Sequence, residues 1–108
     1  MARGRQAGGG IAVSGLPGNN AFYNATYAPT GGLVAGFPSF SAGPKKHLFR
    51  HPELDQWRIS KKPFDPASTG CVANIRAAGG PVPTGARPWG VSDGTKLVDH
   101  DVTAREVA

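Results

Sequence analysis

Two histidines stand at a spacing that suits metal binding on a helix. His47 and His51 are four residues apart, which on a helix would bring both rings to one zinc ion. The segment around them is β-compatible, however, and in a strand their side chains lie about 13 Å apart. The run Asp99-His100-Asp101 offers further ligand types, but adjacent residues of a strand point to opposite faces. We therefore predict no metal site, with the histidines exposed to solvent.

The candidates for nucleophilic and acid–base chemistry are isolated. Cys71 is the single cysteine, so the chain has neither an intrachain disulfide nor a cysteine-based metal site, and we expect a small buried apolar residue. The letters Gly-x-Ser-x-Gly occur at 90–94, but there a short strand and a hairpin turn are expected instead of the strand-to-helix elbow of hydrolases. No Gly-x-Gly-x-x-Gly run or Walker pattern occurs. The seven carboxylates are dispersed; Glu53 and Asp55 flank an expected turn, where capping of backbone amides is the natural role. We predict neither enzymatic activity nor a cofactor.

Basic residues between positions 45 and 62 form the strongest candidate site. Six of the twelve Lys and Arg residues are Lys45, Lys46, Arg50, Arg58, Lys61 and Lys62. A hairpin that turns at 52–55 would bring its two ends together and set 45–46 against 61–62. Like charges facing each other across strands repel, so an anionic partner would relieve them: nucleic acid phosphates, lipid headgroups or an acidic protein surface. The alternative interpretation is four lysines that extend into solvent.

The elements that must position these residues are short strands. Gly and Pro, at 16 and 10 residues, interrupt almost every window and disfavour long helices. We expect strands at 11–14, 21–27, 36–41, 47–51, 56–60, 88–91 and 96–98, whereas 71–78 suits a strand or a single helical turn. Pro38 predicts a sheet edge or a bulge. The expected fold is all-β, a small antiparallel meander or partly open barrel of five to seven strands with long Gly/Pro-rich loops.

One small domain accounts for most of the chain. We expect a flexible basic arm at 1–10, a β domain at 11–98 with a long irregular loop at 61–87, and a polar tail at 99–108. Strand alternation and side-chain size predict a core of Tyr23, Tyr27, Trp57, Ile59, Trp89 and Val91. Asn24-Ala25-Thr26 is formally an acceptor for N-linked glycosylation, but in an expected strand we interpret Asn24 as structural.

The order of several motifs resembles a small β module of algal and other protist proteins. That module reads V-S-G, N-G-T-Y and G-x-P-x-Y, followed by a strand with Trp and a closing W-x-V-x-D-G turn. The corresponding residues here are 13–15, 24–27, 36–38, 56–59 and 89–94. Ala25 replaces the usual glycine, and Leu97 stands where a second aromatic residue is common. The resemblance implies a compact all-β interaction or structural module without catalytic residues.

Three functions follow as expectations. The first is a non-catalytic interaction or structural module, an accessory or linker subunit that docks onto a larger assembly, organellar or otherwise. The second is a small nucleic-acid-binding domain that uses the 45–62 hairpin, in keeping with the formal charge of +5. The third is a carbohydrate-binding β module with a platform drawn from Tyr23, Tyr27, Phe37 and Phe40. We expect an intracellular location, in the cytoplasm or an organelle such as a plastid.

Overall fold

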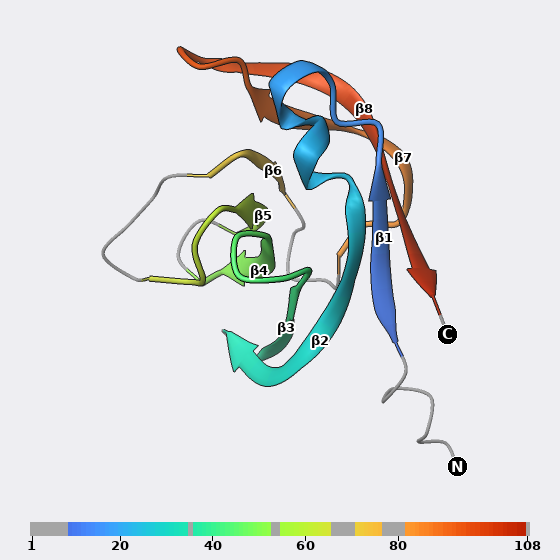
Figure 1. Ribbon diagram of the computed structural model, residues 1–108, viewed down its shortest axis with the longest axis vertical. Helices are drawn as coiled ribbons and strands as arrows, with labels where there is room; N and C mark the ends of the chain where they lie inside the picture. Colours follow the sequence, from blue (N-terminus) through green and yellow to red (C-terminus); the bar gives the residue numbers. More distant parts are fainter. Residues whose placement is uncertain (1–8, 35, 53–54, 66–70, 77–81, 108) are drawn as a thin grey trace.

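Eight antiparallel strands close into a barrel in the part of the chain that the structure describes. A computed structural model describes residues 9–34, 36–52, 55–65, 71–76 and 82–107. Each strand pairs with the next along the chain, and the last pairs with the first (Figure 1). In chain order the elements are β1 (Gly10–Ser14), the 3-10 helix η1 (Gly18–Tyr23), β2 (Ala25–Val34), β3 (Phe37–Ser41), β4 (His47–His51), β5 (Gln56–Ser60), β6 (Ala73–Arg76), β7 (Gly85–Ser92) and β8 (Leu97–Val107).

The all-β class and the antiparallel meander were predicted, but the closure and the strand count were not. The barrel has eight strands and no open edge among the described residues, instead of five to seven strands and a partial opening. The expected polar tail at 99–108 is also wrong, because residues 99–107 belong to β8. β8 pairs with β7 on one side and with β1 on the other, so this strand closes the barrel.

The long loop expected at 61–87 contains a strand and the start of another. β6 occupies 73–76, which decides between the strand and the helical turn in favour of the strand; residues 77–78 lie outside the described residues. β6 pairs with β5 through four residue pairs, among them Trp57 with Ile75. β7 begins at Gly85, three residues before the expected strand.

The expected strand at 21–27 is divided between two elements. Residues 21–23 complete η1, and β2 then runs from Ala25 to Val34, through the Pro-Thr-Gly-Gly sequence that was expected to end it. The pairing of β2 with β3 shifts register between Pro29 and Leu33. Gly31, at φ 91°, lies within this shift, and such a backbone favours glycine. The irregularity is therefore on β2, opposite the strand that carries Pro38.

The central hairpin forms as predicted and is buried on both faces. β4 and β5 pair through five residues, from His47 with Ser60 to His51 with Gln56. One face supplies Leu48 and Ile59 to the barrel interior, where both are fully buried. The other face carries Phe49 and His51, and the ring of Phe64 packs against both at centroid distances of 5.5 and 5.6 Å. The segment after β5 thus folds back over the outside of the hairpin.

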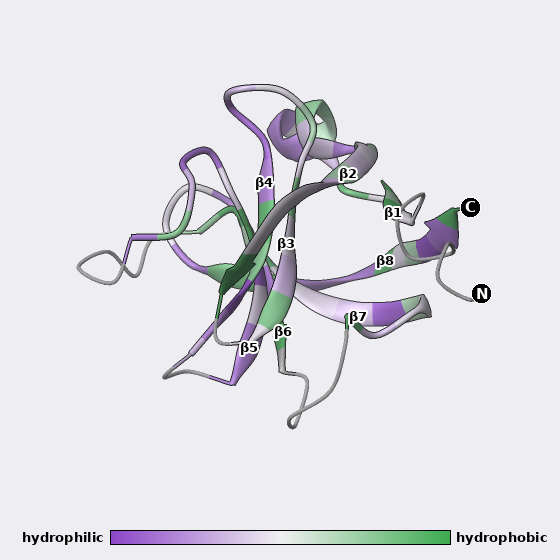
Figure 2. Cartoon of the chain, turned by 90° about the horizontal axis from the view of Figure 1, so that it is seen from below, coloured by the Kyte–Doolittle hydropathy of each residue, from purple (hydrophilic) through white to green (hydrophobic). Residues whose placement is uncertain are grey.

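Side chains fill the barrel interior. In Figure 2 the strands carry hydrophobic and hydrophilic bands in succession, as expected where residues alternate between the interior and the solvent. Five of the six expected core residues, Tyr27, Trp57, Ile59, Trp89 and Val91, are at most 2% exposed, and Tyr23 is partly buried against them. Small eight-stranded barrels are of this packed kind. Among the described residues, no helix has the length and apolar character needed to span a bilayer.

Candidate functional site

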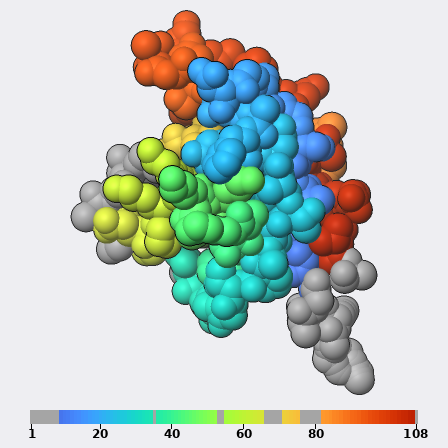
Figure 3. All heavy atoms as spheres, viewed as in Figure 1, coloured from blue at the N-terminus to red at the C-terminus, as the bar shows by residue number. Residues whose placement is uncertain are grey.

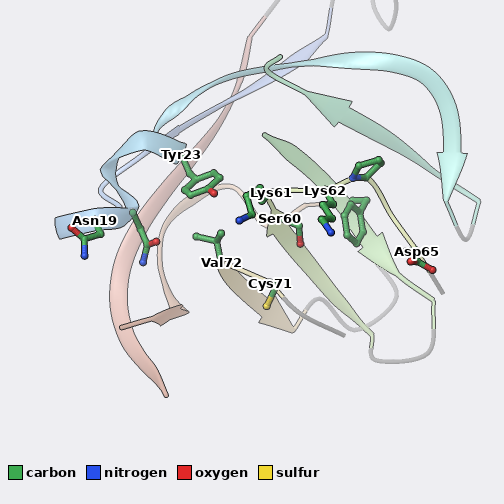
Figure 4. Close-up of a pocket in the computed structure, with 11 residues that line it drawn as sticks. Asn19, Tyr23, Ser60, Lys61, Lys62, Asp65, Cys71 and Val72 are labelled. Carbon is green, nitrogen blue, oxygen red and sulfur yellow. The ribbon is translucent and has the colours of Figure 1, made fainter. Parts of the chain in front are cut away.

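The two ends of the β4–β5 hairpin meet, as the sequence predicted. His47 pairs with Ser60, so the residues just outside this pair, Lys46 and Lys61, lie at the same end of the hairpin. A pocket of about 520 Å³ opens at this end, between η1 and the segments that flank β5 and β6. We call this pocket the lysine groove; its lining residues are Asn19, Asn20, Tyr23, Phe49, Ser60, Lys61, Lys62, Pro63, Asp65, Cys71 and Val72 (Figure 4).

The groove joins parts of the chain that are far apart in sequence. Figure 3 shows η1 in blue beside the green and yellow-green atoms of the hairpin on the same face of the molecule. Figure 4 shows Asn19 and Tyr23 on the side of η1, with Lys61 and Lys62 across from them. Lys61 and Lys62 are exposed, whereas Ser60 and Phe49 beneath them are buried. The groove therefore has a packed floor and a rim of exposed cations.

Hydrogen bonds hold η1 in place at the rim. The side chain of Asn24 accepts a bond from the Leu16 amide at 2.9 Å and donates one to the Leu16 carbonyl at 3.0 Å. Asn20 Nδ2 donates to the carbonyl of Ser92 at 2.6 Å. Leu16 is buried in the core. η1 is thus fixed at both ends, and the side chains that it lends to the groove start from a rigid backbone.

A buried tyrosine also supports η1. Tyr27 is fully buried, and its hydroxyl donates to the carbonyl of Tyr23 at 2.7 Å. Burial, with a smaller contribution from Tyr23, raises the pKa of the Tyr27 phenol well above its ordinary value. The hydroxyl therefore stays protonated and keeps donating to η1 throughout the physiological pH range.

An exposed aromatic ring lies next to the groove, and the sequence did not single it out. Phe22 is 53% exposed, and Lys46 Nζ sits 4.2 Å from the centre of its ring. The ring also packs edge to face on Tyr23, with centroids 5.0 Å apart. The dense turn formers at 15–20 predict an interruption before Phe22, but they do not show that the helical turn extends through Tyr23 and turns Phe22 outward.

The structure separates the two arginines of the predicted cluster from its lysines. Arg50 is 8% exposed, forms an ion pair with Asp55, and holds its guanidinium carbon 4.9 Å from the ring centre of Phe37. Arg58 is 7% exposed and donates through Nε to Gln56 at 3.1 Å. Neither arginine lines the groove, and their contacts named here are made within the hairpin or with the neighbouring β3.

Of the predicted lysines, two line the groove and a third lies next to it. Lys61 and Lys62 line it, and Lys46 lies against Phe22 of the neighbouring η1. Lys45 is exposed and does not line it. The groove also holds one carboxylate, Asp65. Three lysines against one carboxylate leave this region positive, and ammonium and amide N–H groups together suit an anionic group.

Several other residues differ from what the sequence predicted. His51 is 3% exposed and packs edge to face on Phe64, so it is not a solvent-exposed histidine. Cys71 is only partly buried, and its Sγ accepts a hydrogen bond from Asn74 Nδ2 at 3.4 Å. The fully buried residue of this segment is Ala73. Asp55 pairs with Arg50, and Glu53 lies outside the described residues.

The residues considered for metal binding and for carbohydrate binding do not form either kind of site among the described residues. Within the described ranges, no three His, Cys, Asp or Glu side chains gather closely enough to hold a metal ion. Tyr27 and Phe40, expected in an aromatic platform, are 0% and 9% exposed. The four aromatic residues suggested for carbohydrate therefore present no continuous exposed surface.

No family model, no curated protein and no solved structure matches this chain.

Proposed function

We propose that this chain is a non-catalytic binding module that holds an acidic protein surface in the lysine groove. The observation that carries the proposal is the meeting of Lys61 and Lys62 with the amide side chains of Asn19 and Asn20 in one pocket. Carboxylates of a partner accept hydrogen bonds from both kinds of group, and bonds to the ammonium groups are charge-assisted.

The rest of the barrel serves as a scaffold in this proposal. Its interior is packed with side chains, and η1 is fixed through Asn24 and Asn20. A groove on a rigid framework loses little conformational entropy on binding. This fits an accessory or linker subunit of a larger assembly, which the resemblance to a small algal and protist β module also suggests.

The test compares two variants with the same net charge. Lys61→Gln/Lys62→Gln removes two charges from the groove, and Lys96→Gln/Arg105→Gln removes two exposed charges elsewhere. The probe is a fluorescein-labelled decaglutamate peptide, followed by fluorescence anisotropy at low and high NaCl. We expect salt-sensitive binding that weakens about fivefold or more in the groove variant and less than about twofold in the control. Equal losses in both variants would show that only net charge matters.

A second candidate function is binding of single-stranded nucleic acid, which Phe22 favours. Proteins of this kind combine cations with aromatic rings on which bases stack, and Phe22 is exposed beside Lys46. A labelled fifteen-nucleotide oligo(dT) replaces the peptide in the same assay. This function predicts tighter binding of the oligonucleotide than of decaglutamate, and a loss of about 1–3 kcal/mol on Phe22→Ala. An unchanged affinity of Phe22→Ala would reject stacking at this ring.

A further inference from the structure

A second, apolar pocket lies at the end of the barrel where β1 begins. Its volume is about 310 Å³, and Figure 2 views the barrel from this end. We call it the barrel mouth. The lining residues that matter here are Ile11, Phe37, Phe40, Trp57, Val82 and Glu106. None of them lines the lysine groove, so the two sites are separate. Barrel mouths are common positions for small-ligand sites.

Three aromatic rings form one wall of the barrel mouth. The rings of Phe37 and Trp57 have centroids 6.1 Å apart at an interplanar angle of 74°, and those of Phe40 and Trp57 lie 6.2 Å apart at 47°. Trp57 and Phe40 are held firmly, at 1% and 9% exposed. Aromatic side chains grouped in this way form the cages that recognise quaternary ammonium groups.

One carboxylate, that of the exposed Glu106, stands at the rim of this apolar pocket. Glu106 pairs with Ile11 across β1 and β8, and paired residues project to the same side of a sheet, so both line the mouth. Among the described residues of the lining, Glu106 alone is charged. Arg50 lies over the ring of Phe37 and is paired with Asp55. The mouth therefore combines aromatic rings with one carboxylate.

We propose that the barrel mouth binds a methylated alkylammonium group, such as a trimethylammonium head on an alkyl chain. The cation is attracted to ring faces and to the Glu106 carboxylate. An unmethylated ammonium has three N–H donors. In a pocket whose other lining side chains are apolar, the Glu106 carboxylate cannot satisfy all three, and burying unpaired donors is costly. Methyl groups remove these donors and fit an apolar wall. The group could be carried by a trimethylated lysine side chain or by choline.

The experiment separates charge from hydrophobic contact. Choline, Nα-acetyl-trimethyllysine amide and the neutral choline isostere 3,3-dimethylbutan-1-ol are titrated into the ¹⁵N-labelled chain. Binding is followed through the indole N–H resonances of Trp57 and Trp89. We expect a cationic probe to shift the Trp57 signal and to bind about fivefold or more tightly than the neutral alcohol. Equal affinity for the alcohol, or no shift with either cation, would overturn the proposal.

Two substitutions test whether the charge of Glu106 attracts the cationic probe. Glu106→Gln should weaken binding of the cationic probe about fivefold and leave binding of the alcohol unchanged. Asp101→Asn removes the same charge from an exposed position on the same strand and should leave both unchanged. Stronger binding of the lysine derivative than of choline would identify a modified protein side chain as the source, and the reverse order would identify choline. Lys61→Gln/Lys62→Gln should bind these probes normally, so this proposal stands or falls independently of the lysine groove.

Discussion

Asn24 shows how one side chain can take the place of backbone pairing. Its amide group both accepts from and donates to the backbone of Leu16, which is the arrangement that two paired strand residues make. These two bonds join Asn24, directly after η1, to the segment between β1 and η1. The sequence displays Asn24 within a glycosylation pattern, whereas the structure gives it two internal bonds.

Replacing Asn24 should destabilise the barrel. Asn24→Ala removes both bonds to Leu16, and at about 0.5–1.5 kcal/mol for each bond we expect a loss of about 1–3 kcal/mol in the free energy of unfolding. Urea denaturation followed by tryptophan fluorescence measures this loss. Asn24→Asp keeps the acceptor and loses the donor, so its free energy of unfolding should lie between those of the parent and of Asn24→Ala. A stability of Asn24→Ala equal to that of the parent would contradict the structural role.

Asp93 makes the stability of the β7–β8 hairpin depend on pH. Its Oδ1 accepts bonds from the amides of Thr95 and Lys96, both at 2.9 Å, and from the Thr95 hydroxyl at 3.0 Å. These bonds, the one from the Thr95 amide first, lower the pKa of Asp93 below its ordinary value of 3.8. The folded state thus favours the ionised form, and this contribution is present above the ordinary pKa and lost as the pH falls below it.

The variant Asp93→Asn tests this dependence. The amide oxygen still accepts hydrogen bonds but carries no charge, so the variant should melt a few degrees below the parent at about pH 6. The difference in Tm should shrink as the pH falls below about 4, because the parent also loses its charge there. Thermal denaturation at several pH values measures both curves. A difference that stays constant down to about pH 3 would rule out the charge as the cause.

Individual core residues were predictable, and the buried charges were not. Trp57, Ile59, Trp89 and Val91 are large apolar residues at alternate positions, which is a local signal. Arg50 is buried by contacts with Phe37 and Asp55. Phe37 lies on β3, the strand that pairs with β4, so this contact depends on the pairing and register of two strands, which local alternation does not show.

At the scale of elements, β8 is the strand whose length was not predicted: a strand was expected at 96–98, and β8 runs from Leu97 to Val107. Its eleven residues include many polar ones, and most of its burial is concentrated at Val102 and Ala104, both 0% exposed. Two apolar residues in alternation give only weak evidence for a strand when the same segment also contains Asp99, Asp101 and Glu106. The helix η1 was missed for a related reason: six residues rich in Asn and aromatic side chains suit a strand or a turn equally well on local grounds.

Substitutions on the buried face of β8 should destabilise the fold strongly, whereas substitutions on its exposed face should have little effect. Val102→Asp places a carboxylate inside the barrel, where an unpaired charge cannot be accommodated, and we expect loss of the folded state. Asp101→Ser, at the neighbouring exposed position, should change the free energy of unfolding by less than about 0.5 kcal/mol. Near-ultraviolet circular dichroism of the buried tryptophans reports both. A folded Val102→Asp variant would mean that residues 99–107 are the peripheral tail that the sequence suggested.

At the scale of the whole molecule, closure depends on pairing the first strand with the last. β1 and β8 pair through five residues, from Gly10 with Val107 to Ser14 with Thr103. A meander can be predicted because each hairpin is local, but closure requires the correct number of strands and contact between the two ends of the domain. The predicted strand at 96–98 covers only the start of β8, and the part that pairs with β1, residues 103–107, was assigned to a tail. This was enough to leave the predicted barrel open.

This long-range pairing should make folding slow for a chain of this size. Contacts between distant strands are formed only after a large loss of chain entropy, and β proteins of this type fold in about milliseconds to seconds. Stopped-flow dilution from urea, read by the fluorescence of Trp57 and Trp89, measures the rate. Folding within about ten microseconds would be incompatible with a rate limited by closure of the barrel.

The antiparallel pairing of β1 with β8 also determines how the domain responds to mechanical force. Because Gly10 is paired with Val107, a pull on the two strand ends acts across the ladder, and its hydrogen bonds break one after another instead of together. Such unzipping needs less force than shearing a ladder along its length. The first pairs to separate are those of Gly10 and Ile11, which line the barrel mouth with Glu106. Tension would therefore open this pocket before it unfolds the lysine groove.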